Sequence, residues 1–146
     1  MDFYQKLKSK KIVVSKTDDF GYDLRKKWED VFASHLSPLE KKQIYLHSGS
    51  GASGYLWHVF SYDKRKCEKE EQAELAFEKQ YKDTCLIFFQ HSDDVLLVEN
   101  AYDLNTADLL LADGEYADLY VVEQEYKWTY VVTHERGWIG PFFCKR

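Results

Sequence analysis

The chain has 146 residues, a net charge of −5 and 45% hydrophobic residues, which fits a single folded domain over residues 1–146. A nucleic-acid-binding protein needs a clustered basic surface, whereas the lysines and arginines here lie in short runs, most of them beside acidic residues, so we expect no nucleic-acid partner. No apolar run is long enough to cross a bilayer and no leader-like segment is present, so we expect no membrane contact and a cytoplasmic location.

Helices dominate the predicted first half of the chain. Residues 2–9 form a short helix and Ile12-Val13-Val14 a short strand. Apolar residues recur at helical spacing over 24–36. The next segment, Ser37-Pro38-Leu39-Glu40, has the serine, proline and glutamate of a capping box, which predicts a second helix to about residue 45.

A loop rich in serine and glycine, residues 48–54, separates these helices from the next elements. It lacks the lysine of a phosphate-binding loop. We expect a strand over 55–60, although such an apolar run also fits a helix, and a helix over 63–81.

The second half is predicted to consist mainly of strands. Residues 84–90 and 95–99 form one antiparallel hairpin, and 119–122 and 127–133 form another. Asn105 and Asp108 cap a short helix through Leu111, which ends before Gly114, and residues 142–144 close the sheet. The predicted class is therefore α+β, a mostly antiparallel sheet of about five strands with helices packed mainly on one face.

The adjacent pair His134–Glu135 is the first candidate for chemistry. In a continuing strand His134 shares a face with Trp128 while Glu135 faces the opposite way, so the two converge only if the chain turns there, which Gly137 permits. His134 is then either a general base oriented by a distant carboxylate or a structural residue that stacks on Trp138 and bonds backbone.

The predicted hairpin turn His91-Ser92-Asp93-Asp94 is the second candidate. Its carboxylates suit a divalent cation, yet aspartate and serine are also ordinary turn-formers, and we expect no metal site. The cysteines Cys67, Cys85 and Cys144 contain no CxxC pair, and we expect the first two to be unreactive core thiols. No cofactor is predicted.

Aromatic residues are unusually frequent, at 16% of the chain. They are either an aromatic core with tyrosine hydroxyls at its rim or, in part, an exposed patch that contacts a partner. The residues considered in excess of one small core are Tyr45, Tyr55, Trp57, Tyr62, Tyr126, Tyr130 and Trp138.

Four segments together resemble one family: Trp28–Phe32, Gly54–Tyr62, Phe89–Asp93 and Trp128–Glu135. It is a family of small uncharacterised proteins, a domain of unknown function, from spore-forming Gram-positive bacteria. The resemblance covers essentially the whole chain and implies a single-domain cytosolic protein, with no activity or site residue to carry over. The C-terminal Trp-Thr-Tyr to Thr-His-Glu run is also loosely similar to the hairpins that end several bacterial toxin-immunity families.

The leading hypothesis from the sequence is a non-enzymatic protein-interaction module, of an inhibitor or immunity type, that presents acidic and aromatic side chains to a basic protein partner. The alternative is a small hydrolase or metal-dependent enzyme that uses His134 or His91 with nearby carboxylates. No catalytic residue is assigned. The predicted partner-binding residues are Asp93, Asp94, Tyr126, His134, Glu135 and Trp138.

Overall fold

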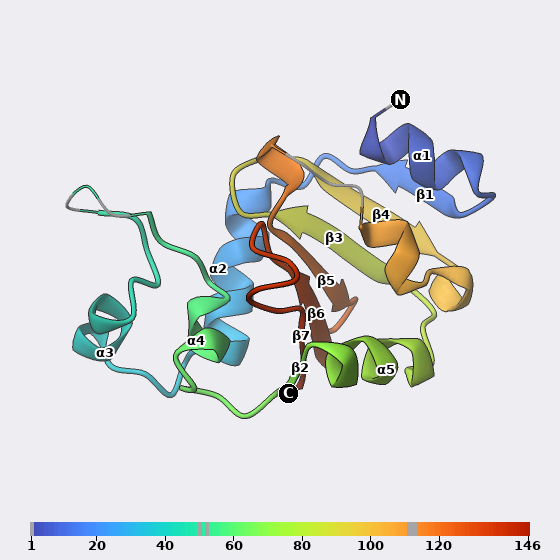
Figure 1. The fold of residues 1–146 in the computed structure, drawn as a ribbon. Helices are drawn as coiled ribbons and strands as arrows, with labels where there is room; N and C mark the ends of the chain where they lie inside the picture. The colour runs from blue at the N-terminus through green and yellow to red at the C-terminus, as the bar shows by residue number, and fades with distance from the viewer. Residues whose placement is uncertain (1, 50, 52, 111–113) are drawn as a thin grey trace.

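A seven-stranded sheet forms the centre of the computed structural model, which describes residues 2–49, 51, 53–110 and 114–146 (Figure 1). Every pair of neighbouring strands is antiparallel. In their order across the sheet the strands are β1 (Val13–Lys16), β4 (Val95–Glu99), β3 (Cys85–Phe89), β5 (Leu119–Glu123), β6 (Trp128–Val132), β7 (Phe142–Lys145) and β2 (Glu68–Lys69).

Helices cover both faces of the sheet (Figure 1). One face carries the helices α1 (Phe3–Ser9) and α5 (Glu71–Lys79), together with the 3-10 helices η1 (Ala101–Asp103), η2 (Thr106–Leu109) and η3 (Gly114–Tyr116). The other face carries α2 (Gly21–Phe32) and α4 (His58–Ser61), with α3 (Pro38–Gln43) further out.

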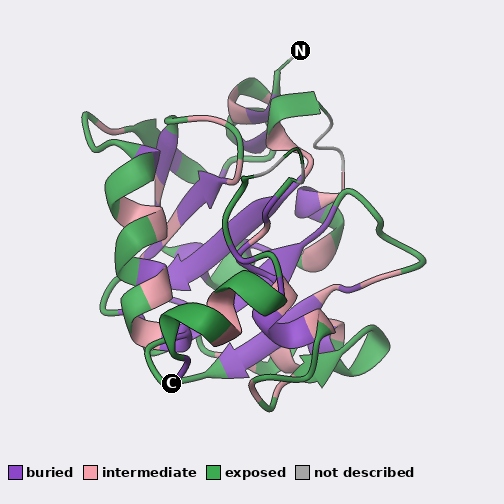
Figure 2. Ribbon diagram, turned by 90° about the vertical axis from the view of Figure 1, so that its left-hand side faces the viewer, coloured by how far each residue is buried: buried purple, intermediate pink, exposed green. Residues whose placement is uncertain are grey.

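The sheet divides the hydrophobic core in two, because successive strand residues point to opposite faces. The α5-side core contains Phe77, Ile87 and Tyr130, with the rings of Phe77 and Tyr130 stacked at 4.4 Å. The α2-side core contains Trp28 and Tyr120, whose rings meet edge to face at 5.4 Å. Figure 2 shows the central strands buried along their length, whereas the edge strands β1 and β2 are largely exposed and the helices bury one face only. Of the seven aromatic residues considered in excess of one small core, three (Trp57, Tyr126 and Tyr130) are core, Tyr55 is half-buried, and Tyr45, Tyr62 and Trp138 are exposed.

The predicted α+β class with an antiparallel sheet is confirmed, as are both hairpins and the capping boxes at Ser37 and Asn105. Strand β3 is apolar on both faces, as its sequence predicts, since it lies between β4 and β5. Two details of the fold prediction are wrong. The sheet has seven strands where we expect about five, and the helices do not lie mainly on one face.

Two elements of the first half differ from their prediction. Residues 55–60 are a turn leading into α4 instead of a strand, and this helical turn lets Trp57 and Phe60, three positions apart, both enter the α2-side core. The helix expected over 63–81 begins only at Glu71, because Asp63 and Glu70 each adopt a φ of 56° that breaks helical geometry.

The end of the predicted helix at Leu111 lies outside the described residues. No helix in the described part of the chain is both long and apolar enough to cross a membrane.

Candidate functional site

Three connecting segments meet at one end of the sheet. Strands β3 and β6 end there, at Phe89 and Val132, and strands β4 and β5 begin there, at Val95 and Leu119. The topology therefore brings together the β3–β4 turn, the residues before β5 and the long turn after β6, although these are far apart in the sequence. The candidate residues of the sequence lie mostly in these segments.

Asp118, the residue before β5, holds this end of the sheet together. It is 2% exposed, and its carboxylate accepts hydrogen bonds from the indole nitrogen of Trp57 (3.0 Å) and from the backbone N–H of His134 (2.8 Å). Its Oδ1 also lies 2.9 Å from Nδ1 of the His134 ring. Because a carboxylate can only accept, the hydrogen-bond network assigns a hydrogen to Nδ1. Three N–H donors thus stabilise one buried charge.

His134 lies between two carboxylates. Its Nδ1 faces Asp118, and its Nε2 is 3.6 Å from Oε1 of Glu135. The ring centroid lies 5.0 Å from that of Tyr55 and 6.0 Å from that of Trp57, and the side chain is 36% exposed. The expected stacking of His134 on Trp138 is replaced by this contact with Tyr55 and Trp57.

Strand β6 ends at Val132, two residues before His134. The rule that successive strand residues point to opposite faces therefore does not apply to His134 and Glu135. The following turn is closed by hydrogen bonds from the backbone N–H groups of Trp138 and Ile139 to the carbonyl of Glu135, at 2.9 and 2.8 Å. Gly137 has a φ of +88°, a conformation that glycine adopts without strain. Trp138 projects from this turn and is 84% exposed, the most exposed large hydrophobic side chain of the described residues.

His91 joins the same surface from the β3–β4 turn. Its ring meets the edge of Tyr55 at 5.5 Å, so His91 and His134 both contact Tyr55. Tyr55 is half-buried. Burial raises its pKa, and the carboxylates of Asp118 and Glu135 add to the effect. The phenol ring is therefore a neutral spacer between the two imidazoles at physiological pH.

The two aspartates of that turn have structural partners. Asp93 accepts from the backbone N–H of Tyr22 (3.0 Å) and pairs with Arg25 (3.2 Å), while Asp94 accepts a hydrogen bond from the hydroxyl of Tyr116. That bond is the main reason why the pKa of Tyr116 rises to about 12. Both carboxylates lie in the same turn as His91, but their hydrogen-bond partners lie outside the group formed by His91, Tyr55 and His134.

Tyr126 is misplaced in the set of predicted partner-binding residues. It is 1% exposed, because it belongs to the α2-side core and its hydroxyl donates to the carbonyl of Leu24 (3.3 Å). A side chain buried in this way is not available to a partner.

Asp118 is the residue of this site that sequence reasoning misses, whereas Tyr55 and Trp57 are named there only among the surplus aromatics. Asp118 stands directly before an apolar strand, a position where a polar residue is ordinarily read as a boundary. The only sequence feature that could have indicated its role is its position just before β5. Because Leu119 pairs with Val132, this position lies beside the end of β6. Trp57 is hidden by the wrong strand prediction for 55–60.

Residues that would suit a metal do not gather here. Within residues 2–49, 51, 53–110 and 114–146, no three histidine, cysteine or acidic side chains stand close enough together to hold a metal ion. What the arrangement provides is an imidazole oriented by Asp118, a turn closed by backbone hydrogen bonds and the exposed indole of Trp138.

The comparisons with known proteins give one match. A family model described as a domain of unknown function, DUF4275, matches residues 1–143. No curated protein matches the chain, and no solved structure does.

Proposed function

The chain belongs to the DUF4275 family of domains of unknown function, and on that premise we propose that it is a protein-interaction module whose contact surface is the turn after β6. The observation that carries the proposal is the 84% exposure of Trp138 on this turn. A large exposed indole is costly in water, and tryptophan is among the residues that most often dominate binding energy in interfaces.

The rigidity of the turn supports this proposal. Asp118 binds both the backbone and the ring of His134, and the backbone bonds of Trp138 and Ile139 to Glu135 close the turn from the other side. A contact residue that is already held in place loses less conformational freedom on binding, so more of the contact energy appears as affinity.

The charge around the turn favours a basic partner. Glu135 lies within the turn, Asp93 and Asp94 lie in the neighbouring loop, and the whole chain carries a charge of −5. Complementary charge accelerates encounter and selects partners. We therefore propose an inhibitor or immunity type of protein that binds a basic protein.

The proposed location is the cytoplasm of a spore-forming Gram-positive bacterium. Its support is the family resemblance together with the three free thiols Cys67, Cys85 and Cys144, which suit a reducing compartment.

Co-purification of matched variants tests the proposal. Tagged wild-type protein, Trp138→Ala and Tyr81→Ala are expressed in parallel in a host of this family, and the bound proteins are quantified by mass spectrometry. Tyr81 is an exposed aromatic in the loop that precedes β3, toward the opposite end of the sheet, so it controls for loss of any surface aromatic.

We expect one basic protein to be recovered with the wild type and Tyr81→Ala and at least about tenfold less with Trp138→Ala, as for a dominant contact residue. Equal recovery with all three proteins, or no enriched protein at all, would reject the proposal.

A second candidate function rests on the His134–Asp118 pair. A buried carboxylate at Nδ1 leaves Nε2 on the exposed side of the ring, which is the orientation of a general base. The second candidate function is therefore that of a small hydrolase. It requires turnover of activated ester or phosphoester substrates that is lost in His134→Ala and retained in His91→Ala. The absence of turnover by the wild type, or equal turnover by His134→Ala, would dismiss it.

A further inference from the structure

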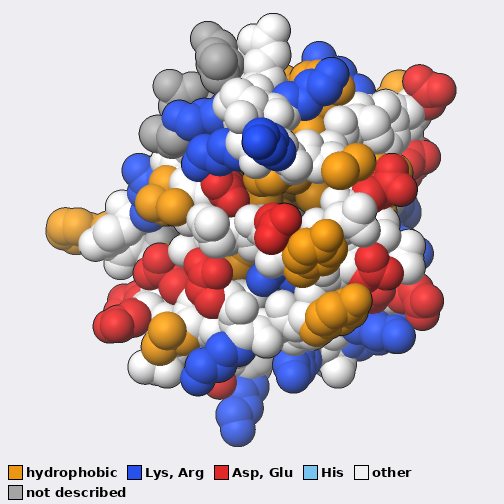
Figure 3. Space-filling model, turned by 90° about the vertical axis from the view of Figure 1, so that its right-hand side faces the viewer, with side chains coloured by type: hydrophobic (Ala, Val, Ile, Leu, Met, Phe, Trp, Pro, Cys, Tyr) orange, Lys and Arg blue, Asp and Glu red, His pale blue; other side chains and the backbone are white. Residues whose placement is uncertain are grey.

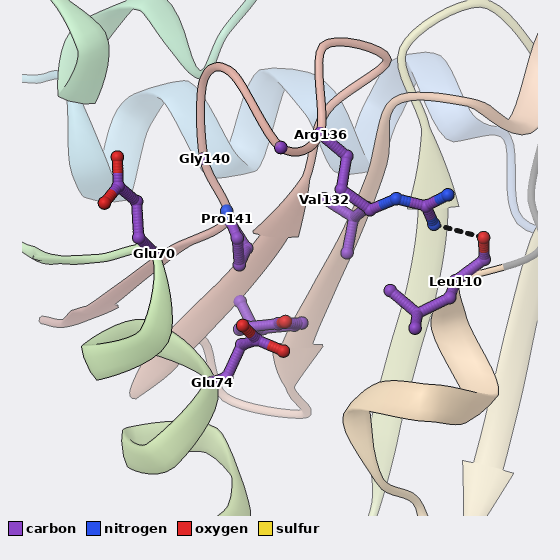
Figure 4. Close-up of a pocket in the computed structure, with 9 residues that line it drawn as sticks. Glu70, Glu74, Leu110, Val132, Arg136, Gly140 and Pro141 are labelled. Atoms are coloured by element: carbon purple, nitrogen blue, oxygen red, sulfur yellow. Dashed lines mark hydrogen bonds between the residues drawn. The ribbon is translucent and has the colours of Figure 1, made fainter.

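A cavity of about 320 Å³ lies on the α5 side of the sheet, behind the turn that presents Trp138 (Figure 4). Its walls come from four separate parts of the fold. They are the start of α5, the end of β6, the turn with Arg136 and Pro141, and Leu110 after η2. The volume is at the lower end of the range for small-molecule sites.

Tyr130 is one of the residues that line this cavity. The residue is 1% exposed and its ring stacks on Phe77, yet its hydroxyl has no hydrogen-bond partner among the residues that the structure describes. Burial raises its pKa, and the carboxylates of Glu74 and Glu78 raise it further, so the group stays a neutral O–H. Because Tyr130 lines the cavity, its hydroxyl can donate a hydrogen bond to an occupant.

Side chains of opposite charge line the cavity. Glu70 and Glu74 line it from α5, and Arg136 lines it from the turn. In the described part of the chain no ion pair joins Arg136 to either glutamate. Arg136 instead donates to the carbonyl of Leu110, which fixes its guanidinium on the far side from Glu74 (Figure 4).

A ligand of a single charge does not suit this arrangement. A simple cation meets the repulsion of Arg136, and a simple anion meets that of two carboxylates. A ligand that carries both charges at separate ends satisfies both walls, and Val132 and Pro141 offer apolar contact between them.

We propose that this cavity binds a small zwitterion of the amino-acid class, with its ammonium group toward Glu70 and Glu74 and its carboxylate toward Arg136. The hydroxyl of Tyr130 hydrogen-bonds the ligand. The site does not rest on the protein-interaction function, because Trp138 is not among the residues that line the cavity. Figure 3 shows acidic, basic and apolar side chains in separate small groups over the right-hand face of the molecule, with no broad apolar area there.

Binding to the intact protein tests the proposal. The protein L-amino acids are screened by thermal shift, and the best of them is then measured by titration calorimetry beside two analogues, the amine that lacks its carboxylate and the acid that lacks its ammonium. We expect saturable binding of at least one amino acid and at least about tenfold weaker binding of both analogues.

Three variants locate the site. Glu74→Gln and Arg136→Gln should each weaken binding at least about tenfold, and Tyr130→Phe should weaken it several-fold, with circular dichroism verifying the fold. Glu71→Gln is the matched control, since Glu71 is an exposed carboxylate on the same helix outside the cavity lining.

Three outcomes would overturn the proposal. They are no saturable binding by any amino acid, equal binding of the amine analogue, and an equal loss of affinity in Glu71→Gln and Glu74→Gln. Because Glu74→Gln leaves the turn unchanged, a folding defect of Arg136→Gln alone does not obscure the result.

Discussion

Asp118 concentrates more of the site's polar interactions than any residue named by the sequence. Its buried carboxylate binds the indole N–H of Trp57, in the turn that leads into α4. It also binds the backbone N–H and the imidazole of His134, in the turn after β6. The sequence correctly indicates His134 as a residue of interest but does not reveal its partner, because a contact between residues 16 positions apart depends on the register of β5 and β6.

Replacing Asp118 by alanine should lower the free energy of unfolding by about 3 kcal/mol, because the buried indole N–H of Trp57 loses its acceptor and the turn after β6 loses its bonds to Asp118 through His134. Replacing His134 by alanine should cost about 1 kcal/mol, since its side chain is partly exposed. Urea unfolding of the two variants measures the difference. Equal losses would mean that Asp118 acts only through the His134 ring.

Glu29 on α2 gives a pH-dependent prediction. Burial raises its pKa, but the hydrogen bonds and charges of His47 and Lys41 outweigh burial and hold the pKa below its usual value of 4.5. The folded state therefore favours the charged carboxylate, and its contribution is present above pH 4.5 and is lost as the pH falls through the lower folded-state value.

Glu29→Gln should accordingly be less stable than the wild type by roughly 1 to 2 kcal/mol at neutral pH, and the difference should shrink below pH 4.5. Unfolding curves recorded at a series of pH values check this. A difference that stays constant from neutral to acidic pH would contradict the assignment.

At the scale of the elements, local signals predict the start of α3 and both hairpins, because capping residues and turn residues act within a few positions. The segment over residues 55–60 is predicted wrongly because an apolar run has no period that distinguishes strand from helix. Its helical turn is decided by long-range contacts, such as the hydrogen bond from the backbone of Leu56 to Gln90 (3.1 Å).

The loop before this segment is closed by a close backbone contact at Gly54. A Cβ atom there would lie 2.0 Å from the carbonyl carbon of His47, whereas a Cβ at Gly49 would meet nothing within 4 Å. We expect Gly54→Ala to cost at least about 2 kcal/mol and Gly49→Ala to change stability by less than about 0.5 kcal/mol. Thermal unfolding of this matched pair measures both, and similar values for the two would show that the loop is not closed in this way.

At the scale of the whole molecule, burial protects the thiols. It raises the pKa of Cys67 to about 11 and that of Cys85 to about 12, and it also raises the pKa of Cys144. Since the thiolate is the reactive form, the native protein at pH 8 should react slowly with a thiol reagent such as DTNB, and unfolding in urea should release all three groups. Reaction of Cys85 at the same rate before and after unfolding would contradict this picture of the core.

The fold class follows from the sequence, because hairpin spacing and apolar patterning are distributed along the whole chain. The candidate site does not. It is formed where the end of β6, the start of β5 and residues 55–57 meet, and only the antiparallel topology determines which of the histidines and carboxylates become neighbours. For the same reason Tyr126, whose sequence context resembles that of a surface turn, lies in the core.

The central claim is that the turn after β6 touches a protein partner through Trp138. Its most direct test replaces Trp138 by a photo-crosslinking amino acid in living cells, with Tyr81 replaced in the same way as the control at the other end of the sheet. We predict one dominant crosslinked product, to a basic protein, from position 138 and none from position 81. No product at position 138, or the same products from both positions, would contradict the claim.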